Sequence, residues 1–142
     1  AFKVPVVLKE FVAAWLAIPK ALQSRLAGSY ATLGRSATIG PRSFSRQSRI
    51  ELRIGALTYK DYKAFLPGGE RLKLLKQAVR DLIGETIDVD LRIVLAAKAV
   101  PPAKLGTVQL ARTTWLARNP ERGDADDMRL RTIVGWREEV AA

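Results

Sequence analysis

The sequence predicts an α+β fold made of two pseudo-repeats, each built from β-strands that carry a long extended loop, with a helical segment joining them. Short segments that alternate apolar and polar residues predict the strands, and the apolar period of residues 70–83 predicts the main helix. The same order of elements occurs twice along the chain, which predicts the repeats. The 142 residues, 48% of them hydrophobic, are expected to form a single-domain fragment of a longer protein, because the first residue is Ala1 rather than Met.

The first repeat, about 1–57, opens with a predicted strand at Val4–Leu8, where Pro5 favours a position at the edge of a sheet. A short helix is expected over Glu10–Leu16, followed by a break at Ile18-Pro19. Another turn or two of helix is expected over Lys20–Leu26.

A long loop and a second strand complete this repeat. Residues 27–49 are rich in Gly, Ser, Thr and Arg and predict the loop. Connections longer than about 12 to 15 residues without internal structure are usually functional or disordered. Ile50–Ile54 alternates apolar and charged residues and predicts a half-buried strand.

A helical connector is predicted over 58–84. Thr58 and Asp61 have the spacing of a capping box before a short helix, which Pro67-Gly68-Gly69 closes. The clearest helix is Glu70–Ile83, with Gly84 as its C-cap. Its apolar stripe consists of Leu72, Leu75, Val79, Leu82 and Ile83.

The second repeat, about 85–134, is predicted to contain strands at Ile87–Leu95 and Met128–Val134. Between them a break at Val100–Pro102 leads into a second long loop, 103–120, and residues 135–142 form a tail. The two loops align weakly, which suggests two copies of a binding event, with chance similarity as the alternative. The aligned groups are Leu33-Gly34 with Leu105-Gly106, Ile39-Gly40 with Leu110-Ala111, and Phe44 with Trp115.

The residue types that are missing exclude much chemistry. Without Cys there are no disulfides, thiolate metal sites or cysteine nucleophile, and without His the usual general base and commonest metal ligand are absent. Asp88 and Asp90 share one face of a predicted strand and have the spacing for acid–base work or a hard cation, but the polar face of an edge strand is the more common case. Gly123–Asp127 lacks the ligands of a calcium loop and is interpreted as a turn. The sequence therefore predicts no enzyme, no cofactor and no metal site.

The net charge of +10 is concentrated near the N-terminus. Residues 11–50 hold six basic and no acidic residues, whereas residues 51–142 hold 16 basic and 13 acidic ones. A local basic excess suggests an anionic partner, with a solvated loop as the alternative. A basic nucleic-acid-binding domain stays open as a second function, although only Tyr30 and Phe44 offer stacking groups in the loop. The longest apolar run, Phe11–Ile18, is too short to span a bilayer.

Five motifs, in this order and at compatible spacings, resemble the C-terminal half of TssG, a baseplate subunit of bacterial type VI secretion systems. They are Leu33–Gly40 (LGRSATIG), Phe65–Gly69 (FLPGG), Asp90–Leu95 (DLRIVL), Val100-Pro101 and Asp124–Asp127 (DADD).

The resemblance implies a non-catalytic adaptor in the baseplate wedge. In the family, one TssG joins two copies of TssF, and two extended TssG loops each dock onto a TssK trimer. It also implies a cytoplasmic protein associated with the baseplate that docks at the inner membrane, with no insertion into the membrane and no nucleic-acid partner.

Carried onto this sequence, the resemblance assigns partner contacts to both loops. Phe44 and Trp115 are the expected aromatic anchors, since a buried aromatic with flanking Arg is typical of binding hot spots. For Trp115 the alternative is packing in the chain's own core. The first loop contributes Leu33, Gly34, Arg35, Ile39, Gly40, Arg42 and Phe44, and the second Leu105, Gly106, Leu110, Arg112, Trp115 and Leu116.

Overall fold

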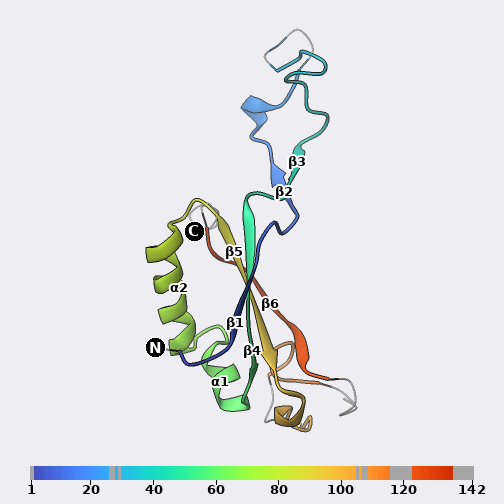
Figure 1. The fold of residues 1–142 in the computed structure, drawn as a ribbon. Helices are drawn as coiled ribbons and strands as arrows, with labels where there is room; N and C mark the ends of the chain where they lie inside the picture. Colours follow the sequence, from blue (N-terminus) through green and yellow to red (C-terminus); the bar gives the residue numbers. More distant parts are fainter. Residues whose placement is uncertain are drawn as a thin grey trace.

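The computed structural model describes residues 2–25, 28, 30–104, 106, 109–115 and 123–135. In this part of the chain a four-stranded sheet carries two α-helices, and a separate two-stranded ribbon extends from one end of it (Figure 1). The predicted α+β class is confirmed. The sheet has the order β1-β4-β5-β6, with β1 at Val6–Lys9, β4 at Arg49–Leu57, β5 at Asp88–Leu95 and β6 at Ala125–Val134.

The strand directions place the two long connections at opposite ends of the sheet. β1 pairs antiparallel with β4, and β5 pairs antiparallel with β6, whereas the central pair β4 and β5 is parallel. The connection from β1 to β4 therefore leaves one end of the sheet and the connection from β5 to β6 leaves the other (Figure 1). Each half contributes two strands to the four-stranded sheet and has a long connection between them, but the repeat and its boundaries stay predictions.

The core lies between the helices and one face of the sheet. Along β5, Val89, Leu91 and Ile93 all point to this face, because side chains alternate along a strand. They pack with the buried residues of α1 (Tyr59–Ala64) and α2 (Glu70–Ile83). The apolar residues that alternate along the sequence of β5 thus form the face of the sheet that the helices cover.

The structure confirms the predicted start of α1, and the predicted bounds and C-cap of α2. The Thr58 hydroxyl accepts the N–H of Asp61 (3.3 Å) at the start of α1, and α2 has the predicted bounds. Gly84 follows α2 with a φ of 73°, and its N–H donates to the Arg80 carbonyl (2.9 Å). The prediction that Leu82 belongs to the apolar stripe was wrong, because its side chain is 84% exposed. The last turn of α2 contributes half-buried Ile83 to the core.

The predictions for residues 10–49 need correction. The expected helix over Glu10–Leu16 is instead an irregular segment followed by the strand β2 (Ala14–Ala17). β2 pairs antiparallel with β3 (Arg42–Ser45), which lies inside the segment predicted to be loop. A short apolar run fits either a helix or a strand, and here the pairing with a distant strand decides. Of the second expected helix, one 3₁₀ turn forms at Lys20–Leu22.

The second half also differs from prediction at one strand end. β6 begins at Ala125, so Asp126 and Asp127 lie on a strand and not in the predicted turn. A 3₁₀ turn at Ala97–Ala99 follows β5. Most of the predicted tail, and the predicted contact residues Leu105 and Leu116, lie outside the described residues. Neither α1 nor α2, the α-helices of the described part, is long and apolar enough to cross a membrane.

Candidate functional site

The connection from β1 to β4, residues 10–48, is called the arm here. Its ribbon continues beyond the end of the sheet (Figure 1). At the root, the N–H of Val12 donates to the Arg49 carbonyl (3.1 Å), which fixes the arm to the start of β4. Farther out, the N–H of Ile18 donates to the Pro41 carbonyl (2.9 Å) beyond the last strand pair. The arm is thus held by backbone hydrogen bonds at its root and along the ribbon.

An exposed aromatic pair lies on the ribbon. Trp15 and Phe44 are direct cross-strand partners, their ring centroids are 5.3 Å apart and their planes meet at 65°. They are 61% and 51% exposed, and the Arg46 guanidinium lies 5.9 Å from the Phe44 ring. Aromatic rings beside an arginine are frequent in binding hot spots. Sequence reasoning missed Trp15, because its place opposite Phe44 follows only from the strand register.

The tip of the arm exposes aliphatic side chains. Leu33 is 89% and Ile39 is 96% exposed. The backbone between them is ordered by its own hydrogen bonds, since the Thr32 carbonyl accepts the N–H groups of residues 35, 36 and 37 at 3.0 to 3.2 Å. Gly34, with a φ of 76°, supports this turn. All seven contact residues predicted for the first loop are exposed on the arm.

The second connection comprises residues 96–124, and its described residues Arg112 and Trp115 contact Tyr62 on α1. Trp115 is half-buried, and its ring centroid lies 5.7 Å from that of Tyr62. Its indole N–H donates to the Asp127 carboxylate (3.1 Å). The Tyr62 hydroxyl donates to the Arg112 carbonyl (2.9 Å). Trp115 therefore packs against the chain's own core, which is the alternative that the sequence left open.

The remaining described contact residues of this connection are exposed. Leu110 is 87% exposed, and Gly106 and Arg112 are exposed as well. The structure thus separates the predicted second site into an exposed part around Leu110 and the half-buried Trp115.

Burial affects the chemistry of Tyr62. It raises the pKa of the Tyr62 hydroxyl to about 12, and the nearby Asp127 carboxylate and Tyr59 add smaller upward effects. The hydroxyl stays protonated at neutral pH and can donate its hydrogen bond to Arg112.

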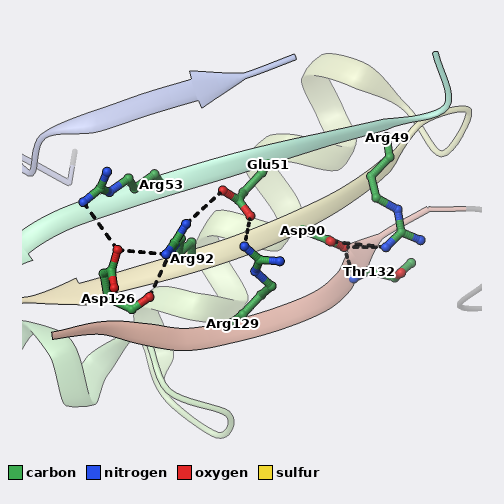
Figure 2. A network of polar contacts seen from close by, with 8 residues as sticks. All are labelled: Arg49, Glu51, Arg53, Asp90, Arg92, Asp126, Arg129 and Thr132. Carbon is green, nitrogen blue, oxygen red and sulfur yellow. Dashed lines mark hydrogen bonds and ion pairs between the residues drawn. The ribbon is translucent and has the colours of Figure 1, made fainter. Parts of the chain in front are cut away.

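The face of the sheet opposite the helices carries a network of ion pairs (Figure 2). Arg49 donates through one terminal nitrogen to both oxygens of Asp90 (3.3 and 3.2 Å) and through the other to Asp88 (3.1 Å). Asp90 also accepts the N–H of Thr132 on β6 (2.8 Å). The expected edge-strand position of Asp88 and Asp90 was wrong, because β5 is central and the two residues are 1% and 3% exposed.

A second group of charges extends this network across β4, β5 and β6. Glu51, 3% exposed, lies 2.9 Å from Arg129 and 3.8 Å from Arg92. Arg92 also binds Asp126 (2.8 Å), and Arg53 approaches the same carboxylate (3.9 Å). Opposite charges facing each other across strands favour one register, because any slip would leave a buried charge unpaired. Among the residues that the structure describes, no group of three or more acidic side chains could hold a metal ion.

Fold and surface together define an α+β domain in which the exposed aromatic side chains, and several of the exposed aliphatic ones, lie on the arm. The sequence model of the family "Type VI secretion, TssG" matches residues 1–117. The chain therefore belongs to the TssG family, as its sequence motifs indicated.

Two solved structures are similar to this chain. One is described as the type VI secretion system TssK-TssF-TssG baseplate subcomplex (16% identity, TM-score 0.60, covering 92% of this chain and 55% of that chain). The other is the baseplate complex from the type VI secretion system (19% identity, TM-score 0.57, covering 95% and 39%). These likenesses show a shared fold, and this chain spans about half or less of the chains it resembles. No curated protein matches the sequence significantly.

Proposed function

We propose that this chain is a structural, non-catalytic subunit of the type VI secretion baseplate wedge, where it binds two copies of TssF and docks TssK trimers through its two long connections. Membership of the TssG family supports the proposal, as does the likeness to a TssK-TssF-TssG subcomplex. The assembly belongs on the cytoplasmic side, at the baseplate docked to the inner membrane. The boundaries of the two pseudo-repeats belong to the same proposal.

The single observation that carries the docking role is the exposed apolar surface of the arm. Trp15, Phe44 and Ile39 are each more than half exposed in the free chain, which is costly in water. Covering one such side chain contributes roughly 1.5 to 3 kcal/mol of transfer free energy. A partner that buries the aromatic pair and the tip together therefore gains a strong anchor.

At the other end of the sheet, the docking surface is centred on Leu110. Gly106 and Arg112 lie in the same connection and are also exposed. Leu105 and Leu116 remain proposed contacts. Trp115 acts here by holding the connection against Tyr62, because its ring is already packed on that side chain.

The experiment is reconstitution of the full-length protein with TssF and TssK, followed by affinity measurement with labelled TssK. Phe44→Ala, Trp15→Ala and Leu110→Ala should each weaken TssK binding about tenfold or more, as truncation of a hot spot does. Leu82→Ala is the matched control, since Leu82 is 84% exposed on α2 and outside both connections. Unchanged TssK affinity with all three residues truncated would refute the docking role.

The basic charge on the arm is expected to affect the rate of association with the partner. Lys20, Arg25 and Arg35 are exposed and basic, so an acidic partner surface would be attracted over a distance. Reversing these charges should mainly lower the association rate, and the effect should shrink at high salt.

Nucleic-acid binding is the alternative that the basic arm favours. It predicts submicromolar binding of DNA or RNA at physiological salt, falling steeply as salt is added. On the arm, Trp15 and Phe44 contact each other edge to face, so neither presents a free stacking platform on both sides. A salt titration with labelled oligonucleotides distinguishes the two functions.

A further inference from the structure

A cleft of about 400 Å³ lies at the root of the arm, between the ribbon and the charged face of the sheet. The arm lines it with Trp15 and Arg42, and the sheet lines it with Arg49, Arg129, Arg131 and Asp90. It shares Trp15 and Arg42 with the docking surface proposed for the arm, whereas Arg49, Arg129, Arg131 and Asp90 lie on the sheet and outside that surface.

The cleft has a surplus of positive charge. Arg49 is compensated by Asp88 and Asp90, and Arg129 by Glu51. Arg42 and Arg131 are exposed, and neither has an ion-pair partner within the part of the chain that the structure describes. Two guanidinium groups, one from each wall, are therefore available to an anion.

The walls of the cleft are fixed relative to each other. The N–H of Val12 on the arm bonds to the carbonyl of Arg49 on β4, and the Arg49 side chain is held by two carboxylates of β5. The acidic residue in the cleft is already satisfied, because Asp90 binds both Arg49 and the N–H of Thr132. A preformed site loses little entropy on binding, and a compensated Asp90 opposes an incoming anion only weakly.

We propose that this cleft binds an acidic segment of a partner protein, with Arg42 and Arg131 holding carboxylate side chains and Trp15 contacting a neighbouring apolar side chain. Guanidinium groups bind carboxylates in paired hydrogen bonds, which suits arginine better than lysine for this role. A nucleic-acid strand fits less well, since two surplus charges neutralise few phosphates and only one aromatic ring lines the cleft.

The test is fluorescence anisotropy with the intact protein and a labelled peptide, Gly-Glu-Leu-Glu-Leu-Glu-Gly, beside the same peptide with glutamine in place of glutamate. The acidic peptide should bind at least tenfold more tightly than the neutral one. Arg42→Gln and Arg131→Gln should each weaken binding about fivefold or more, because each removes a charge-assisted contact. Lys98→Gln removes the same charge from the exposed turn after β5, and should change affinity less than twofold.

Arg131→Gln is the decisive variant, because Arg131 lies on β6 and not on the arm. Its loss should leave the docking of TssK by the arm tip unchanged, so the two proposals can fail separately. The cleft proposal is overturned if the acidic peptide does not bind at millimolar concentration, or if Lys98→Gln weakens it as much as Arg131→Gln. Tighter binding of single-stranded DNA, lost in the same two variants, would also overturn it in favour of a phosphate ligand.

Discussion

The aromatic residues of the two long connections differ in their surroundings. Phe44 on the arm contacts Trp15 and the Arg46 guanidinium, both on the arm, and stays half exposed. Trp115 on the second connection lies against Tyr62 and the core. Residues at matching places in the sequence pattern therefore lie in different surroundings, one exposed to solvent and the other packed against the core.

The position of α1 explains the difference. α1 follows directly after β4, and because β4 and β5 are parallel, it lies at the end of the sheet where the second connection starts. There Tyr62 offers that connection a ring and a hydroxyl donor. The arm leaves from the other end and reaches beyond the sheet (Figure 1), and its side chains Trp15, Leu33 and Ile39 stay more than half exposed.

The largest expected effect concerns the root of the arm. Arg49→Met should lower the free energy of unfolding by about 3 to 5 kcal/mol, because it leaves the buried carboxylates Asp88 and Asp90 without their cation. Arg46→Met, at an exposed arginine of the arm, should change it by less than about 0.5 kcal/mol. Denaturant unfolding measures both. Equal effects would show that the ion pairs of Arg49 do not stabilise the fold.

The second effect depends on pH. Since the pKa of Tyr62 is raised to about 12 from an ordinary value of 10, the protonated form is the one that folding favours. This stability is fully present below pH 10 and is lost as pH rises through 12, by roughly 2 to 3 kcal/mol in total. Absorbance titration of the phenolates should show one tyrosine ionising late, and Tyr62→Phe should remove that late step. A titration in which Tyr62→Phe removes no late step would contradict it.

The third effect compares the two aromatic anchors directly. Trp115→Ala should lower the free energy of unfolding by about 2 kcal/mol, less than a fully buried tryptophan would, because the side chain is half-buried. Trp115→Phe should restore much of the loss by keeping a ring against Tyr62. If Trp115→Ala unfolds like the wild type, the second connection does not depend on this contact.

The smallest expected effect on stability is that of Phe44→Ala, at less than about 1 kcal/mol, since the half-exposed ring packs on Trp15 and not on the core. A double-mutant cycle with Trp15→Ala should give a coupling of about 0.5 kcal/mol for the ring pair, at the low end of what aromatic pairs contribute. Stability loss comparable to that of Trp115→Ala would remove the contrast between the two connections.

Sequence reasoning succeeded where local signals decide the structure. The amphipathic period and the flanking glycines defined α2 at Glu70–Ile83, and the Thr58 cap defined the start of α1. It failed where a distant segment decides. The strand β2 forms because it pairs with β3, some 25 residues later, and no local pattern shows that pairing.

Some features of the candidate site could likewise be predicted from the sequence, whereas others depend on the arrangement of distant segments. The exposure of Leu33 and Ile39 agrees with a Gly- and Ser-rich loop, which sequence alone indicates. The place of Trp115 beside Tyr62 depends on how the second connection crosses α1, and the burial of Asp88 and Asp90 depends on β5 being central. Such facts follow from strand order and could not be read from spacing.

The line of the arm has a mechanical consequence. The arm continues the direction of β1 and β4, so a pull on its tip would act along these strands (Figure 1). Because the arm connects the end of β1 to the start of β4, such a pull moves both strands in the same direction, and the load falls on the hydrogen bonds between β4 and β5. These bonds run across the strands, so they are loaded together rather than one after another. Arg49 would pass part of this load through its side chain to β5, the strand at the centre of the core. The arm is thus attached in the direction in which a sheet best resists tension.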